Sequence, residues 1–224
     1  MWEISGNGLP APSYIIGTHH LASVDFAQNI PGFNEALSSA SQVVGEVVME
    51  DMLSKLGHIM TLSMMPADTT YRDLLSEADY AELDRQLTSL FGAGLDQLGM
   101  LKPSMLSNVL SMMLYTESSP ELGTMLQDPM SGIDGYVQRV ASENGKPCIG
   151  LESTESQIDL LVSQPLKQQA DELLCMIINM DYSREMVKKL NDSYFAADLV
   201  ALYDLLDPSG NPCPISDEYE YQLN

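Results

Sequence analysis

Lysine and arginine are scarce in this sequence. Its 224 residues include 10 basic residues against 32 acidic ones, which gives a formal net charge of −22 at pH 7. Because proteins bind phosphate groups through clustered Lys and Arg side chains, this balance argues against a nucleic-acid-binding function. It argues equally against attachment to an anionic membrane surface. We therefore expect neither nucleic acid nor an anionic bilayer among the partners of this protein.

Long apolar runs are missing as well. The apolar stretches are broken within a few residues, whereas a membrane-spanning helix needs roughly 20 apolar residues in succession. The first eight residues, MWEISGNG, contain neither the basic nor the apolar part of a signal peptide. A mature domain from which a leader had been removed would read the same way. We predict no membrane-spanning segment, and export remains open.

Cysteine is rare and scattered. The three cysteines are Cys148, Cys175 and Cys213, and none forms a C-x-x-C pair. This pattern argues against both a disulfide framework and a zinc knuckle. We predict that Cys148 and Cys175 are small buried apolar residues. Cys213 lies in a loop between two prolines and could either pair or stay free.

The common nucleophile and nucleotide-binding motifs are absent. The sequence contains no G-x-S-x-G and no Walker A motif. Gly6-Asn7-Gly8 is predicted to be a turn, because no G-x-G-x-x-G leads from a strand into a helix. The acidic residues include no D-x-D-x-D-G loop, so calcium is not indicated. Most of these acids are predicted to form a solvated face.

The composition is otherwise that of a globular protein. Hydrophobic residues make up 45% and charged residues 19% of the chain, which is compatible with a buried core and not with disorder. The length predicts one domain, or at most two small ones. Short β-type runs at 2–5 and 13–16 flank a turn rich in Gly and Pro, so we predict an N-terminal β-hairpin. Residues 31–40 are predicted to be a helix with Pro31 in its first turn.

Two further segments have strand character. Residues 42–49 are apolar and β-branched without alternation, a pattern typical of a buried strand in a parallel or mixed sheet. Glu46 interrupts this run, and a lone carboxylate is costly to bury unless it is paired, protonated or at a strand end that faces a cleft. Residues 146–152 form the second segment, which ends on another acid, Glu152.

Most of the remaining chain has a helical pattern. Spacings near 3.6 predict helices at 71–75 and 80–90, with Thr70 and Ser76 as N-terminal caps. The other predicted helices are residues 101–115, which are apolar and rich in Met, residues 133–144 with Gly145 following, and residues 154–180 and 183–206.

The order of these elements predicts an α/β fold. We expect a mixed sheet that starts with the N-terminal β-hairpin and is flanked by helices. Residues 1–206 would form this domain, and the block from about 50 to 143 would be a helical cap inserted into it. Residues 207–224 are predicted to be an acidic tail that contains proline and has little to pack.

Candidate site residues follow the predicted strands. His19 and His20 stand together after Gly17 at the end of the second strand, and Glu46 and Glu152 lie at or near the ends of later strands. Open α/β sheets bind ligands at the carboxyl ends of their strands, so these residues would converge on one cleft if the strands are parallel. Imidazole and carboxylate ligands suit zinc, manganese or iron, and a carboxylate can also act as a general base.

A structural interpretation of the same residues is also open. His20 would then be a hydrogen-bonded residue at a strand end, and Glu46 would pair with one of the few basic residues. His58, the third histidine, is predicted to be structural. The 15 methionines include no M-x-x-M cluster with His or Cys, so we expect them to fill the core or line an apolar groove rather than bind copper.

Three segments together match a known pattern. They are the Trp2–Gly8 strand and turn followed by the strand that ends in Gly17-Thr18-His19-His20, the apolar strand around Glu46, and the block Gly132–Glu152 followed by Gln157. In this order and spacing they resemble the TraB/PrgY/GumN family, which includes the Tiki proteases. The resemblance covers the chain up to about residue 206.

This resemblance implies an α/β fold related to erythromycin esterase and to haem-associated ChaN-like proteins. It implies a peptidase-like, metal-dependent hydrolase with zinc or manganese as its metal and a peptide or small molecule as its substrate. By the same resemblance, His20 and Glu46 would hold the metal, and Glu46 and Glu152 would be catalytic. The other implied binding residues are Gly17, His19 and Gln157. The family also suggests a bacterial cell-envelope or secreted protein whose leader has been removed.

The sequence departs from the family pattern at one point. The family has a second G-x-x-H motif, but here no histidine follows Asp207. His19 does not replace it, because adjacent residues of a strand point to opposite faces. We therefore expect a fragment, an engineered piece or a degenerate paralogue, in which a catalytic metal site would lack one ligand. Both an active and an inactive hydrolase stay open on this ground.

Two other classes of function stay open. A non-catalytic module would use the Met-rich helical cap, with Met105, Met112 and Met113, as an apolar groove for a peptide or a hydrophobic small molecule. A structural or surface-exposed domain would use its acidic coat for solubility. The sequence carries no signal for an oligomeric state.

Overall fold

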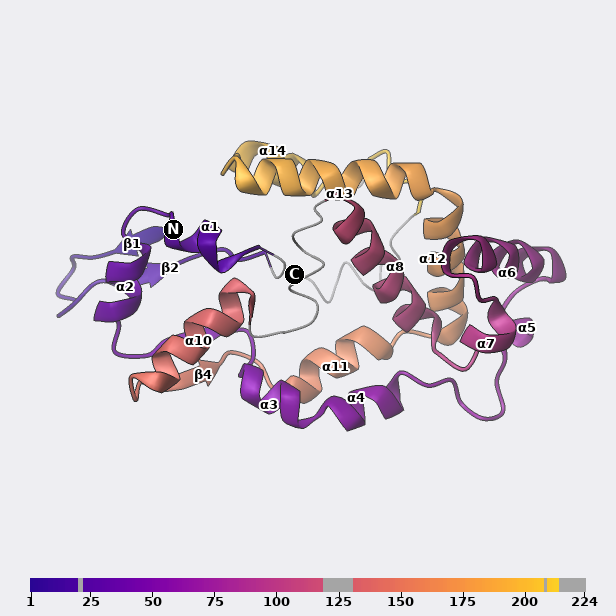
Figure 1. The fold of residues 1–224 in the computed structure, drawn as a ribbon, viewed down its shortest axis with the longest axis horizontal. Coiled ribbons are helices and arrows are strands. Elements are labelled where there is room, and N and C mark those ends of the chain that lie inside the picture. The colour runs from indigo at the N-terminus through magenta and orange to yellow at the C-terminus, as the bar shows by residue number, and fades with distance from the viewer. Residues whose placement is uncertain (20–21, 119–130, 208, 214–224) are drawn as a thin grey trace. The chain divides into compact units, whose positions relative to one another are not determined.

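The computed structural model describes residues 1–19, 22–118, 131–207 and 209–213. Helices dominate in these residues, and the two small β-sheets among them make the fold mixed α/β, as predicted (Figure 1). The chain divides into two compact units. The first contains Met1–Gly57 and Ser119–Ile158, and the second contains His58–Ser118 and Asp159–Asn224. The predicted domain of residues 1–206, its helical cap from about 50 to 143 and the tail of residues 207–224 remain predictions.

The first unit begins with the predicted β-hairpin. Strands β1 (Trp2–Ile4) and β2 (Ser13–Ile15) pair antiparallel, with Trp2 opposite Ile15. Gly6 and Gly8 take φ angles of +89° and +80° in the connection. Because side chains with a Cβ rarely adopt such angles, the glycines allow the chain to reverse here.

The second sheet is a parallel pair. Strands β3 (Val43–Gly45) and β4 (Cys148–Gly150) lie side by side, with Val43 opposite Cys148 and Gly45 opposite Gly150. The predicted buried strand at 42–49 is wrong in two respects: it is three residues long, and Val44 is 48% exposed. It ends early because helix α3 already begins at Met49, whose amide is bound by a side chain from another helix.

The described residues of the first unit also form the helices α1 (Val24–Gln28), α2 (Phe33–Ser39), α3 (Met49–Ser54) and α10 (Ile133–Glu143). Helix α10 packs against β3 and β4. Helix α2 confirms the helix predicted at 31–40, although it begins after Pro31. Helix α10 ends as predicted, with Gly145 following at a φ angle of +67°. The Lys146 ammonium donates to the carbonyls of Leu37 and Ser38, so it satisfies free acceptors at the end of α2.

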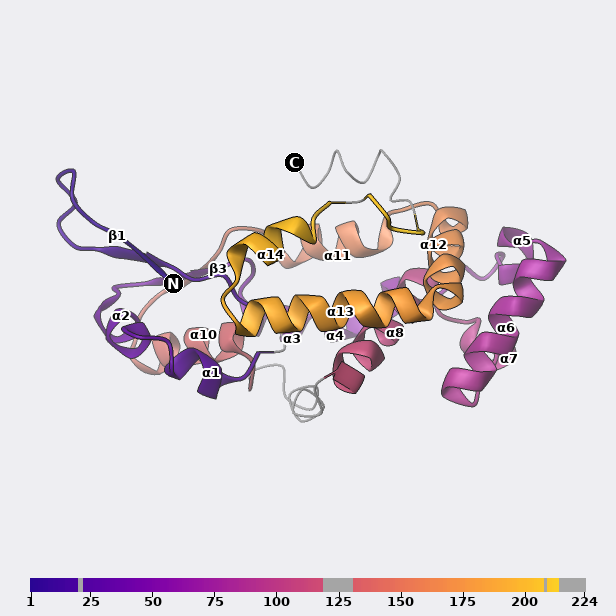
Figure 2. The ribbon, with the colours of Figure 1, turned by 90° about the horizontal axis from the view of Figure 1, so that it is seen from above.

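Helices form the second unit. They are α5 (Tyr71–Leu74), α6 (Glu77–Phe91), α7 (Leu95–Leu98), α8 (Pro103–Ser118), α12 (Leu166–Ile178), α13 (Met180–Phe195) and α14 (Leu199–Asp204). The division between the units falls within α4 (Leu56–Leu62) and α11 (Thr154–Val162) along the chain. Helix α14 folds back against α13 (Figure 2). His58 lies exposed on α4. Among the described residues, no helix is both long and apolar enough to cross a bilayer.

Both predicted N-terminal caps are confirmed. The Ser76 hydroxyl accepts a hydrogen bond from the Asp79 amide at 3.2 Å, and α6 begins at the next residue. At α5 the Asp73 carboxylate accepts from the Thr70 amide at 2.8 Å. These bonds satisfy amides that have no partner within a helix, which is why such residues mark helix starts in a sequence.

The two long helices predicted at 154–180 and 183–206 are wrong, because each is divided. The first breaks before Pro165, whose ring lacks an amide hydrogen, and resumes as α12. The second begins three residues earlier than predicted and breaks at Ala197, which has a φ angle of +54°. Helix α14 then starts with the Asp198 carboxylate accepting from the Ala201 amide.

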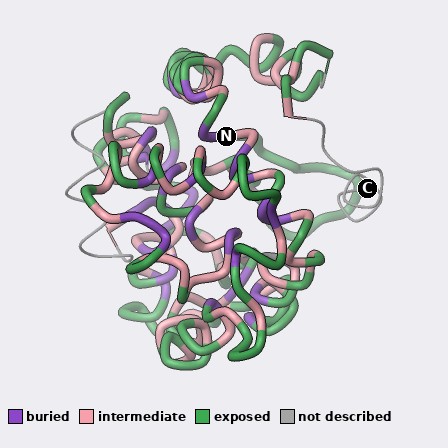
Figure 3. Tube along the Cα trace, turned by 90° about the vertical axis from the view of Figure 1, so that its right-hand side faces the viewer, coloured by how far each residue is buried: buried purple, intermediate pink, exposed green. Residues whose placement is uncertain are grey.

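The core of the second unit lies between α8 and α12. Leu106, Leu110 and Leu114 follow one another at every fourth position of α8, and all are at most 2% exposed. Leu173 and Ile177 of α12 belong to the same cluster. This confirms the helix predicted at 101–115, although only one of its faces is buried and Val109 is 42% exposed. Along the trace, buried stretches alternate with exposed ones, as amphipathic helices require (Figure 3).

The buried Gln169 joins these two helices. Its amide oxygen accepts from the Ser104 amide at 3.2 Å, and its amide nitrogen donates to the Gln164 carbonyl at 2.7 Å. The side chain is 1% exposed. It therefore satisfies one free amide at the start of α8 and one carbonyl before α12.

The prediction for Cys175 is wrong. Cys175 of α12 forms a disulfide with Cys213, across 38 residues of sequence, and is only partly buried. Sequence spacing gave no indication of this pair, because it depends on the return of the chain through α13 and α14. Cys148 is the free cysteine and is half-buried in β4.

Breaking this disulfide should destabilise the second unit. We expect Cys213→Ser to lower the free energy of unfolding by about 2–4 kcal/mol, because the cross-link restricts the unfolded chain over a loop of this length. Urea denaturation followed by circular dichroism measures the change. Cys148→Ser is the matched control and should leave the disulfide and the effect of added reductant intact. A wild-type protein that unfolds at the same urea concentration with and without reductant would contradict the assignment.

Candidate functional site

The parallel pair brings two glutamates to one edge of the sheet. The Leu151 amide donates to the Gly45 carbonyl at 2.9 Å, and the Glu152 amide donates to the Glu46 carbonyl at 2.8 Å. The pairing thus continues past the strands, to the two residues singled out in the sequence. Both glutamates are exposed. The parallel arrangement on which the predicted cleft depended is therefore present for Glu46 and Glu152.

Glycines allow these strand ends to approach their neighbours. A Cβ at Gly45 would lie 2.8 Å from the side-chain nitrogen, Nε2, of Gln138. A Cβ at Gly150 would lie 2.9 Å from the Glu152 carbonyl oxygen and 3.3 Å from the Val47 Cα. At Gly150 the obstructing atoms belong to the backbone, so glycine is required there. At Gly45 the nearest atom is the end of the Gln138 side chain, so an added Cβ would displace the Gln138 carboxamide.

Gln157 lies next to this edge, as predicted for a site residue. It belongs to α11, and its side-chain amide donates to the Glu46 carboxylate at 3.4 Å, a long hydrogen bond. The structure therefore groups Glu46, Glu152 and Gln157. Their roles in binding or catalysis remain predictions.

The Gly17-Thr18-His19-His20 segment is anchored to α10. The Thr18 hydroxyl donates to the Asp134 carboxylate at 2.7 Å, in the first turn of that helix. His19 is half-buried, and its carbonyl accepts from the Ala22 amide at 2.8 Å. Gly17 is exposed. His20, the predicted metal ligand, lies outside the described residues.

Helix α10 holds two of the predicted segments by one face. Asp134 binds the histidine segment, and Gln138 lies four residues later, one turn along the same face. The Gln138 amide nitrogen donates to the Val47 carbonyl at 2.9 Å, and its oxygen accepts from the Met49 amide at 3.0 Å. Asp134, which binds the histidine segment, therefore lies one helical turn from Gln138, which binds the turn after Glu46.

Gln138 was not among the residues predicted from the sequence to form the site. The residue is 7% exposed and stands among the buried positions Ile133 and Ala141 of an amphipathic helix. A polar residue on the apolar face of a helix was a usable signal, because a buried amide group is found where it can form hydrogen bonds. Its partners, however, lie about 90 residues away in sequence and could not be inferred.

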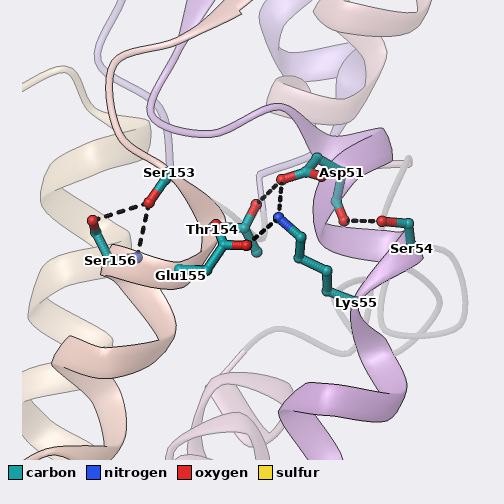
Figure 4. A network of polar contacts seen from close by, with 7 residues as sticks. All are labelled: Asp51, Ser54, Lys55, Ser153, Thr154, Glu155 and Ser156. Atoms are coloured by element: carbon teal, nitrogen blue, oxygen red, sulfur yellow. Dashed lines mark hydrogen bonds and ion pairs between the residues drawn. The ribbon is translucent and has the colours of Figure 1, made fainter.

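A charged network connects α11 to α3 (Figure 4). The Thr154 hydroxyl donates to the Asp51 carboxylate at 2.7 Å, and the Lys55 ammonium lies 2.8 Å from Asp51 and 2.6 Å from Glu155. Hydrogen bonds from Lys55 and then Thr154 lower the pKa of Asp51, and the bond from Lys55 lowers the pKa of Glu155. Hydrogen bonds to these two carboxylates raise the pKa of Lys55. The hydrogen bonds of the network thus favour the charged form of all three groups.

The described residues contain some of the side chains that could bind a metal, whereas His20 lies outside them. Within the described part of the chain, no three His, Cys, Asp or Glu side chains are placed to hold an ion together. Glu46 and Glu152 provide exposed carboxylates at the strand ends. The arrangement can therefore supply negative charge and proton acceptors at this edge of the sheet.

These features define an α/β protein with a polar site at the ends of a parallel strand pair. Its sequence matches the TraB/PrgY/gumN family over residues 1–223, and the chain belongs to this family. The match covers nearly the whole chain and confirms the resemblance that the separate motifs suggested. No curated protein and no solved structure matches the chain.

Removing the Gln138 carboxamide should destabilise the first unit. In Gln138→Leu the Val47 carbonyl and the Met49 amide lose their buried partner, so we expect a loss of about 2–3 kcal/mol in the free energy of unfolding. Thermal and urea denaturation measure it. Arg139→Gln, at the exposed neighbouring position of α10, should stay within about 0.5 kcal/mol of the wild type. Equal stability of the two variants would exclude Gln138 as an anchor.

Proposed function

We propose that this protein is a metal-dependent hydrolase that cleaves peptides, as the resemblance to the Tiki proteases implies. The observation that carries the proposal is the parallel pairing of β3 and β4, which brings Glu46 and Glu152 to one strand-end edge. Two facts support it: the family membership of the chain and the anchoring of the histidine segment beside the Glu46 turn by α10.

The metal in this proposal is zinc or manganese. Imidazole and carboxylate oxygen are ligands that both ions accept, and His20 and Glu46 would provide them. When bound, the ion would supply positive charge that polarises the scissile carbonyl group. The carboxylates at the strand ends fit such a group in chemistry and in their access to solvent.

The residues of the chain would have separate roles. Glu152 would accept a proton from the attacking water and return it to the leaving amine, as a general acid–base group does. Glu46 shares the edge and would assist, with Gln157 orienting its carboxylate by the hydrogen bond described above. Gly17 and His19 would contact the substrate next to the motif histidine. The exposed edge is open to an extended peptide.

Peptide hydrolysis tests the proposal directly. Protein loaded with Zn²⁺ or Mn²⁺ is incubated with a library of fluorogenic peptides, and initial rates are measured with and without a chelator. We expect chelation to abolish cleavage, and His20→Ala and Glu46→Gln each to lower kcat/KM by about 100-fold or more, since removal of a general base or metal ligand has effects of this size.

Glu143→Gln is the matched control for these variants. It replaces an exposed carboxylate at the far end of α10 in the same unit and should leave the rate unchanged. Equal rates in wild type, His20→Ala and Glu46→Gln would show that the hydrolysis comes from a contaminant and would end the proposal.

A binding module that uses the Met-rich helices is the alternative. Met105 and Met112 are half-buried on α8, and Met113 packs against the core of the second unit. Isothermal titration calorimetry with Zn²⁺, Mn²⁺ and a pool of apolar peptides separates the two functions. Stoichiometric metal binding that His20→Ala abolishes supports the hydrolase. Peptide binding that needs no metal and is weakened by Met112→Gln supports the module.

We also propose that the protein works outside the reducing cytoplasm. The Cys175–Cys213 disulfide supports this, because such bonds form and persist in oxidising compartments. Alkylation of the protein in freshly lysed cells, followed by mass spectrometry, tests it: only Cys148 should be modified. Alkylation of all three cysteines would place the protein in a reducing compartment.

A further inference from the structure

The adjacent hydroxyl groups of Ser153 and Thr154, at the start of α11, have different partners. The Ser153 hydroxyl accepts from the Ser156 amide at 3.1 Å, which caps the helix. Thr154 is the next residue, and its hydroxyl donates to Asp51 of α3 at 2.7 Å (Figure 4). Because Ser153 already provides the cap, the Thr154 bond serves a contact between helices rather than the start of its own helix.

Burial and neighbouring ion pairs hold the Thr154–Asp51 hydrogen bond in place. Thr154 is 1% exposed, so its hydroxyl has no water to bond with in place of Asp51. Asp51 is held in turn by Lys55, which also pairs with Glu155 beside Thr154. The start of α11 is therefore joined to α3 by two connections, one through a hydroxyl and one through an ammonium group.

The segment that these bonds hold carries the candidate site residues. Glu152 lies two residues before Thr154, and its amide is bound to the Glu46 carbonyl. Gln157 lies three residues after Thr154 on the same helix face and reaches the Glu46 carboxylate. Glu46 is itself five residues before Asp51, so the contacts form a closed ring from the end of β3 through α3 and α11 and back.

We propose that Thr154 is a positioning residue that sets the place of Glu152 and Gln157 relative to Glu46. This inference rests on the proposed hydrolase function for its effect on rate, and on the ring of contacts alone for its effect on structure. Without the hydroxyl, the chain from Glu152 to Gln157 keeps its bonds to Glu46 and the solvent-accessible Lys55–Glu155 pair but loses its buried link to α3. The two site residues then shift away from the strand end.

Two substitutions at Thr154 separate the hydroxyl from the shape of the side chain. Thr154→Val keeps the volume and removes the donor, whereas Thr154→Ser keeps the donor and should restore wild-type behaviour. Ser153→Ala is the matched control, because it removes the helix cap one residue away and leaves the bond to Asp51 intact.

Native-state hydrogen exchange, read by NMR, tests the structural part. Thr154→Val should speed exchange of the Glu152 amide by roughly tenfold or more, since local opening becomes easier. Thr154→Ser should exchange as the wild type does. Ser153→Ala should speed exchange at Ser156 but not at Glu152. Unchanged exchange of the Glu152 amide in Thr154→Val would overturn the proposal, and so would an equal effect from Ser153→Ala.

Steady-state kinetics test the consequence for the reaction. Thr154→Val should lower kcat by roughly 10- to 100-fold with little change in KM, as displacement of a reacting group by about 1 Å does. Thr154→Ser should restore kcat, and Ser153→Ala should retain it. If the wild type cleaves no peptide while Glu152 exchange still responds to Thr154→Val, the hydrolase proposal fails and the positioning role stands. If kcat is the same in Thr154→Val and wild type, the positioning role is overturned.

Discussion

The buried carboxamide of Gln138 is the contact on which the candidate site depends. It satisfies the Val47 carbonyl and the Met49 amide together, at the point where the chain leaves the β-ladder and enters α3. The Val47 carbonyl would otherwise be buried without a partner, at a cost of about 1–3 kcal/mol, and the partly buried Met49 amide would lose its bond as well. One side chain thus binds the chain after the strand and the first amide of the helix, and it lies so close to Gly45 that an added Cβ there would displace it.

Around the strand ends, the exposed residues and the buried polar residues have different roles. The groups assigned to chemistry, Glu46 and Glu152, are exposed, whereas the groups that hold them, Gln138 and Thr154, are buried. Buried polar side chains with satisfied hydrogen bonds have a single arrangement, and exposed carboxylates have many. Helices α10 and α11 each contribute one such fixed residue, so both sides of the strand pair are held by neighbours rather than by the short sheet itself.

Local features of this protein could be predicted from its sequence, and distant pairings could not. The caps at Thr70 and Ser76 and the glycine after α10 depend on neighbouring residues, so their signals are complete within a few positions. The strand-end glutamates were found because strand character and a lone acid coincide in one short run. The Cys175–Cys213 bond and the reach of Gln138 to Val47 depend on how α13, α14 and α10 return, which no local pattern records.

The disulfide also changes what a cut in the chain would do. Helices α13 and α14, and the exposed turn at Ala197 between them, lie within the covalent loop that Cys175 and Cys213 close. Cleavage of the backbone inside this loop would leave both ends joined through sulfur. A protease that nicks the turn would therefore produce a two-chain molecule of unchanged mass except for one added water, and α12 would keep the distal fragment at the unit to which it belongs.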